Sequence, residues 1–101
     1  MVNLKVPPER AILLMRERID AIQTIPEDGH GLDFGKTIMW MVKTWDVIRE
    51  IYGDDDPHYK KIHIFTLPNF TDHNTESQAL TEFYRYRMLD YIDEIEKSKK
   101  T

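Results

Sequence analysis

The most constraining feature of this 101-residue chain is the segment 33–52, in which apolar side chains recur at helical spacing. At 100° per residue, six of them lie within about 40° of one line along a helix. Asp33 is suited to cap the start of this helix, and Gly53 is suited to end it in a left-handed conformation. The six residues of this stripe are Phe34, Ile38, Met41, Trp45, Ile48 and Tyr52.

The N-terminal segment predicts a second helix. Pro7 and Pro8 suit a first helical turn, where the N–H that proline lacks would have no partner. The helix is predicted from about Glu9 to Thr24, before a loop rich in proline and glycine at residues 26–31. Its apolar face comprises Ile12, Met15, Ile19 and Ile22.

A short helix is predicted after the central one. Asp56 is suited to cap its start, Pro57 is suited to its first position, and it extends to about Ile62. The sequence that follows is predicted to be a loop, and we expect its Leu67 and Phe70 to pack on the core.

The last helix is predicted over residues 75–97. It begins with the sequence Thr75-Glu76-Ser77-Gln78, which has the form of a capping box. Its final turn carries lysines, which suit the negative end of a helix dipole. Its apolar stripe comprises Leu80, Tyr84, Met88, Tyr91 and Ile95.

Three long helices and one short helix predict an all-α fold, a small antiparallel bundle. We expect a single domain over residues 1–101, with residues 1–6 and 98–101 frayed at its ends. A core of this size is marginal by area, which favours a homodimer or a protein partner.

The composition excludes several classes of function. The chain has no cysteine, so disulfides, thiol chemistry and cysteine-ligated metals are excluded. Fourteen basic and 18 acidic side chains give a net charge of −4, which disfavours a nucleic-acid partner. No apolar run approaches the roughly 18 residues of a membrane span, and the N-terminus lacks a signal-peptide core. The sequence therefore predicts a cytoplasmic protein without a membrane partner.

The central helix carries a second apolar face. Trp40, Val47 and Ile51 lie about 100–140° from the main stripe. One interpretation packs Trp40 against the short helix or the loop after it. The other makes these three residues a surface for a dimer or a docked partner, since tryptophan is enriched at interface hot spots.

The acidic turn contains residue types that bind metals. The weak candidates for metal ligands are Asp54, Asp55, His58 and His63. Their spacing matches no calcium loop and no His-Glu-x-x-His motif, and a solvated turn with an N-cap explains them more simply. A small metal- or ligand-binding protein is the alternative function that this segment supports.

No catalytic constellation is present in the sequence. Its two serines, Ser77 and Ser98, lie in no nucleophile motif, and no phosphate-binding loop is found, so we expect neither enzymatic activity nor a cofactor. Arg85 and Arg87 alternate with tyrosines that could stack on bases. Acidic side chains in the same helix would repel phosphates, which favours core packing and ion pairs instead.

One stretch resembles a known helical module. It comprises Trp40, Thr44, the sequence Ile51-Tyr52-Gly53 at a helix end, and the acidic turn and short helix of residues 54–62. The module occurs in bacterial and phage-related proteins, in some of them as the N-terminal or accessory domain of TIR-like or abortive-infection-type defence proteins. Residues 6–12 and 89–96 are similar to its first and closing helices.

The resemblance has departures, because the module usually has phenylalanine at the positions of Tyr52 and often at that of Ile62. It carries no catalytic residue, and it implies a recurring packing or docking unit. The chain would then be either a free-standing version of the module or one domain of a longer protein. The sequence thus predicts a non-enzymatic module for protein–protein interaction or self-association, in a phage-defence or mobile-element context.

Overall fold

The computed structural model describes residues 3–28, 31–63 and 73–99 of the chain. These residues form four α-helices: α1 (Pro8–Asp20), α2 (Phe34–Tyr52), α3 (Pro57–His63) and α4 (His73–Lys99). The prediction of an all-α fold with three long helices and one short one is confirmed. Among the described helices, none combines the length and the apolar character that crossing a membrane requires.

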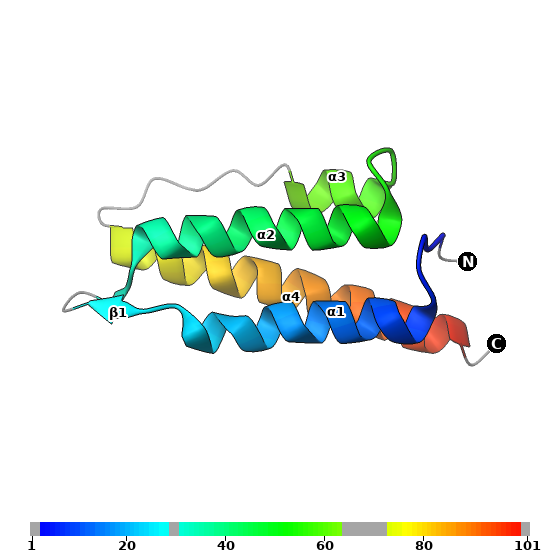
Figure 1. The fold of residues 1–101 in the computed structure, drawn as a ribbon, viewed down its shortest axis with the longest axis horizontal. Coiled ribbons are helices and arrows are strands. Elements are labelled where there is room, and N and C mark those ends of the chain that lie inside the picture. Colours follow the sequence, from blue (N-terminus) through cyan, green and yellow to red (C-terminus); the bar gives the residue numbers. More distant parts are fainter. Residues whose placement is uncertain (1–2, 29–30, 64–72, 100–101) are drawn as a thin grey trace.

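The long helices pack side by side. Helix α4 contacts both α1 and α2, while α3 lies beside the C-terminal half of α2 (Figure 1). Helix α1 runs opposite to its two neighbours, whereas α2 and α4 run in the same direction (Figure 1). A parallel pair is possible because α3 turns the chain back along α2 before α4 begins.

The predicted caps of α2 and α3 are confirmed. The Asp33 carboxylate accepts the backbone N–H of Lys36 at 2.8 Å, and Gly53 ends α2 with φ of 93°. At the start of α3, the Asp56 carboxylate accepts the backbone N–H of His58 at 2.7 Å. These short-range signals set the helix boundaries because each satisfies a backbone group that the helix itself leaves unpaired.

Described residues near both ends of the chain contact the rest of the fold. The Lys5 N–H donates to the Ile51 carbonyl at 2.7 Å, and Leu4 and Val6 pack against the core. At the other end, α4 continues to Lys99, whose ammonium lies 3.2 Å from the Glu9 carboxylate. Residues 4–6 and Lys99, which belong to the segments 1–6 and 98–101 expected to fray, therefore contact other elements of the fold.

The end of the first helix and the loop after it differ from the prediction. Helix α1 ends at Asp20 and continues as the 3-10 helix η1 (Ala21–Thr24). The following loop contains a minimal antiparallel pair, β1 (Glu27–Asp28) and β2 (Gly31–Leu32).

Helix α4 also begins earlier than predicted. It starts at His73, so Thr75 lies inside the helix. The capping-box pattern had predicted Thr75 as the N-cap, and that prediction is wrong. Leu67 and Phe70, expected to pack on the core, lie outside the described residues.

The core confirms the stripe on α4 and corrects the one on α2. Every residue of the α4 stripe is buried. On α2, only Ile48 and Tyr52 of the predicted stripe are buried, because the helix turns a face rotated by about 70° toward α1 and α4. The residues buried on that face are Thr37, Trp40, Thr44, Ile48 and Ile51.

The buried threonines explain the rotation. The Thr37 hydroxyl donates to the Asp33 carbonyl at 2.8 Å, and the Thr44 hydroxyl donates to the Trp40 carbonyl at 2.9 Å. Because each hydroxyl is satisfied within its own helix, these small side chains can be buried and neighbouring helices can approach closely.

Candidate functional site

Trp40 is a core residue between α1 and α4. Its side chain is 4% exposed, and its ring meets that of Tyr84 edge-on, with 5.9 Å between the centroids. Its indole N–H donates to the Arg18 carbonyl at 2.9 Å. The tryptophan thus contacts α1 and α4, whereas one interpretation of the sequence packed it against the short helix or the loop after it.

The surface predicted from Trp40, Val47 and Ile51 is not open to a partner. Ile51 is fully buried, and Val47 is half-buried against the core. The second apolar face of α2 is therefore largely used inside the chain. The expectation that these three residues form an exposed contact surface is corrected accordingly, because the helix is packed on both of its apolar faces.

Arg18 lies beside Trp40 at the edge of this packing. Its guanidinium carbon is 5.8 Å from the centroid of the Trp40 ring. Its Nε lies 3.3 Å from the Thr44 hydroxyl, and its Nη2 lies 3.5 Å from the Trp40 carbonyl. Burial lowers the pKa of Arg18 from its ordinary value.

Arg18 has no acidic partner within the described part of the chain. None of the described carboxylates lies within 4 Å of its guanidinium, although three other arginines make such contacts. A half-buried guanidinium keeps its charge and offers five N–H donors in a planar fork. The contacts of Arg18 therefore compensate only part of the free-energy cost of removing its charge from water.

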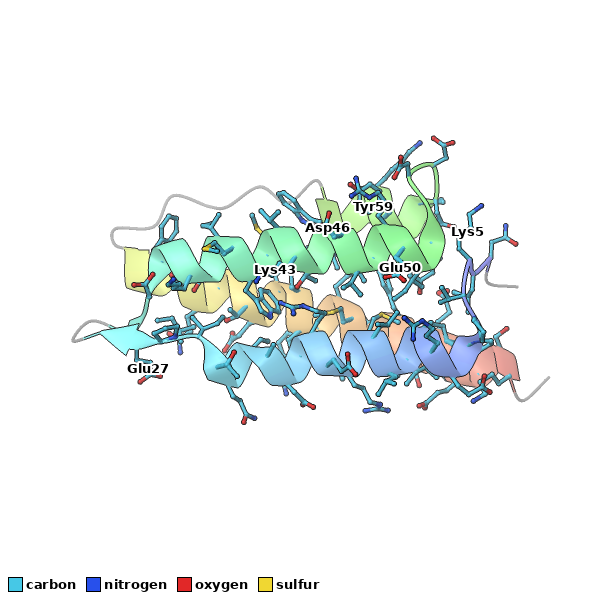
Figure 2. All side chains as sticks on the ribbon, in the orientation of Figure 1. Lys5, Glu27, Lys43, Asp46, Glu50 and Tyr59 are labelled. Atoms are coloured by element: carbon cyan, nitrogen blue, oxygen red, sulfur yellow. The ribbon has the colours of Figure 1, made fainter. Side chains whose placement is uncertain are left out.

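Arg18 lines a groove of about 270 Å³ between η1 and the N-terminal half of α2, which we call the Arg18 groove. Met39, at its rim, is 52% exposed. The charged side chains among its described lining residues are all cationic: Arg18, Lys36 and Lys43. Its apolar lining comprises Ala21, Ile25, Pro26, Met39 and Trp40. Figure 2 shows Lys43 along the edge of α2 that faces α1.

The sequence contains a signal for Arg18 that was not used in predicting the site. Ala11 and Met15 are the two buried residues of α1, and Arg18 follows them at spacings of 4 and 3. An arginine in line with the buried face of an amphipathic helix marks a charge held at the core boundary. The groove itself was not predictable, because it requires η1 to lie against α2.

His58 joins α3 to α4 through two carboxylates. Its Nδ1 lies 2.7 Å from Asp56 Oδ1, and its Nε2 lies 2.8 Å from Glu94 Oε1. Its ring stacks on that of Tyr52 with a centroid distance of 4.4 Å, and its carbonyl accepts the Tyr91 hydroxyl at 2.7 Å. Both ring nitrogens are therefore engaged in contacts that hold the fold together.

The candidate metal ligands that the structure describes are Asp54, Asp55 and His58. Asp54 and Asp55 are exposed, and Asp54 lies 3.8 Å from the Arg49 guanidinium. The side chain of His63, the last residue of α3, lies outside the described part. Among the described residues, no group of three or more histidine, aspartate or glutamate side chains is placed to hold a metal ion.

Buried hydroxyl groups provide no accessible catalytic group. Ser77 is fully buried in α4. Burial raises the pKa of Tyr84 to about 12, and a hydrogen bond from the Trp45 indole N–H partly opposes that increase. Burial likewise raises the pKa of Tyr91 to about 12. These phenols stay neutral at ordinary pH and serve packing.

The aromatic and basic residues of α4 are divided between core and surface. Arg85 lies over the ring of Tyr86, and Arg87 lies over that of Phe83, each with the guanidinium carbon 5.2 Å from the ring centroid. Tyr86 is exposed, whereas Tyr84 and Tyr91 are buried and cannot stack on bases. The described residues thus bring no continuous aromatic platform together on this helix.

Comparisons with protein-family models, with curated proteins and with solved structures give no match to this chain. The resemblance to the helical module of defence proteins therefore stays a prediction. Its central residues lie in the core: the Thr44 hydroxyl bonds the Trp40 carbonyl, and Tyr52 and Gly53 end α2.

Proposed function

We propose that this chain is a non-enzymatic helical module that binds a protein partner through the Arg18 groove. The observation that carries the proposal is Met39, a large apolar side chain more than half exposed in the lining of a groove that combines apolar and cationic side chains. Methionine is flexible and polarizable, and is enriched where surfaces receive the apolar side chains of partners.

The size of the groove supports a peptide side chain as its occupant. Small-molecule and cofactor pockets measure roughly 300–1,000 Å³ and enclose most of their ligand. The Arg18 groove, at about 270 Å³, is smaller and open to solvent along η1. It offers room for one or two side chains of a partner, which would contact the exposed side chain of Met39.

The groove lining also favours binding over catalysis. Among the described residues of its lining, the polar side chains are cationic or hydroxyl groups, and none is a carboxylate or imidazole that could act as a general base. The defence or mobile-element context belongs to this proposal through the sequence resemblance alone.

Selection from a displayed library of random peptides, with the whole chain as bait, tests this function. We expect enriched peptides that bind the wild type at least about tenfold more tightly than the Met39→Glu variant. The matched control is Leu13→Glu, which changes an equally exposed residue of α1 (53%) outside the groove lining and should leave binding intact. Failure to enrich any peptide, or equal binding to Met39→Glu, would refute the proposal.

Light scattering of the same proteins tests self-association. A dimer that Met39→Glu abolishes and Leu13→Glu preserves would identify a second copy of the chain as the occupant of the groove. A wild-type chain that is monomeric would exclude a second copy as the occupant of the groove.

A further inference from the structure

We infer that the Arg18 groove receives an acidic segment, with a carboxylate on the Arg18 guanidinium and a neighbouring apolar side chain against Met39. This inference rests on the proposed function and names the chemistry of the partner.

The first argument is the state of Arg18. Its guanidinium is half-buried, and its polar contacts are two long ones, at 3.3 Å to the Thr44 hydroxyl and 3.5 Å to the Trp40 carbonyl. A carboxylate could accept two parallel hydrogen bonds from the guanidinium fork, the geometry in which arginine binds most strongly. Binding would thus compensate a charge that the described part of the chain leaves without an acidic partner.

The second argument is the charge around the groove. Lys36 and Lys43 are exposed at its edge, and neither forms an ion pair with a described carboxylate. Three cations therefore gather in the lining of a groove on a chain whose net charge is −4, and no other described lining residue is acidic. Such a local concentration of one sign attracts an acidic partner and orients it on approach.

The contrast with the rest of the bundle strengthens this argument. Elsewhere on α1, Arg10 lies 4.0 Å from Glu50 on α2, and Arg16 lies 3.2 Å from Glu96 on α4. Figure 2 shows Glu50 on the same edge of α2 as Lys43, nearer the other end of the helix. Arg10 and Arg16 of α1 thus pair with carboxylates of neighbouring helices, whereas Arg18 of the same helix has no carboxylate partner among the described residues.

A peptide suits this site better than a nucleic acid or a membrane. A phosphate backbone requires a track of several cations, and exposed Asp20 and Glu27 adjoin the groove residues Ala21 and Pro26 in sequence. These carboxylates would repel an extended polyanion that continued past the groove. A short acidic segment with one apolar side chain avoids them and uses the apolar wall that Met39 and Ile25 provide.

The experiment uses the peptides selected by the wild-type chain and one designed probe, a short labelled peptide of alternating glutamate and leucine. We expect the selected sequences to be enriched in aspartate and glutamate beside an apolar residue. Fluorescence polarization should show about fivefold to tenfold weaker binding of the probe to Lys36→Gln/Lys43→Gln, because two charge contacts are lost. The matched control Lys60→Gln/Lys61→Gln removes two exposed lysines of α3 and should change binding less than about twofold.

The counterpart probe, with glutamine in place of glutamate, separates the two proposals. Its binding should be at least about tenfold weaker than that of the acidic probe, and only the acidic probe should lose affinity as salt is raised. Selected peptides that require Met39 but carry no acidic residues would overturn the inference and leave the proposed function standing. If no selected peptide requires Met39 for binding, both the inference and the proposed function are overturned.

Two further probes test the rejected partners. A single-stranded DNA oligonucleotide and vesicles containing phosphatidylserine should bind the wild type and Lys36→Gln/Lys43→Gln equally weakly. Tighter binding of either probe than of the acidic peptide, lost in that double variant, would assign the groove to a polyanion and overturn the inference.

Discussion

Replacing Trp40 by alanine is the sharpest test of how this bundle is held together. The indole is 4% exposed, contacts Tyr84, lies under the Arg18 guanidinium, and donates its N–H to the Arg18 carbonyl. Truncation of a buried tryptophan costs about 3–5 kcal/mol. The unfolding free energy of a chain of this length is about 5–15 kcal/mol, so the variant loses a large share of it.

The assay is guanidinium chloride denaturation followed by far-ultraviolet circular dichroism, which does not depend on the deleted fluorophore. We expect an unfolding free energy lower by about 3–5 kcal/mol and a Tm lower by at least about 10 °C. The matched control is Met39→Ala, at the adjacent and exposed position of α2, which should change stability by less than about 0.5 kcal/mol.

Either of two results would refute this reasoning. A Trp40→Ala variant within about 1 kcal/mol of the wild type would mean that the indole is not a core anchor. Its face of α2 would then be available to a partner, as the second interpretation of the sequence held. Equal decreases in unfolding free energy for Trp40→Ala and Met39→Ala would mean that α2 does not turn the described face toward α1 and α4.

Three further predictions concern other parts of the fold. Gly53→Ala should lower the unfolding free energy in urea by about 1–3 kcal/mol, because φ is 93° and the new Cβ would lie 3.0 Å from Lys5 Cε; an unchanged midpoint contradicts this. His58→Gln should cost about 1–2 kcal/mol by removing the link between Asp56 and Glu94, whereas Lys60→Gln should leave stability unchanged in the same melts. The free energy of unfolding should keep its full value up to about pH 10 and decrease from there toward pH 12, because burial raises the pKa of Tyr84 and Tyr91 to about 12 in the folded state. Phenolate absorbance should therefore rise together with unfolding; ionisation of all five tyrosines near pH 10 in a still-folded chain contradicts this.

The helices and their ends were predictable because the signals for them are local. Asp33 caps α2, Gly53 ends it, and Asp56 with Pro57 starts α3, each through residues adjacent in sequence. The stripe on α4 was also correct, since that helix packs against two others with its most apolar face.

The orientation of α2 was not predictable from apolar spacing alone. Hydrophobicity selected the line through Phe34 and Trp45, but the buried face centres on Thr37 and Thr44, whose hydroxyls bond their own helix. With its hydroxyl hydrogen-bonded to its own helix, threonine behaves as a small core residue. A pattern that counts threonine as polar therefore does not predict its burial.

The candidate site was less predictable than the fold. The sequence directed attention to Trp40, whereas the exposed part of that region is Met39 and the cations around it. Arg18 and Lys43 are far apart in the chain, and only the packing of α1 and η1 against α2 brings them to one groove. Such contacts between distant elements leave no spacing that a single sequence can reveal.

The claim that the Arg18 groove binds an acidic segment is tested most directly by nuclear magnetic resonance. The isotope-labelled chain would be titrated with the peptide of alternating glutamate and leucine. We predict that the largest shifts fall on the Arg18 side-chain Nε, the Trp40 indole, and the backbone amides of Lys36, Met39 and Lys43. Shifts confined to the outer face of α4, where Tyr86 is exposed, or no shifts at saturating peptide, would contradict the account.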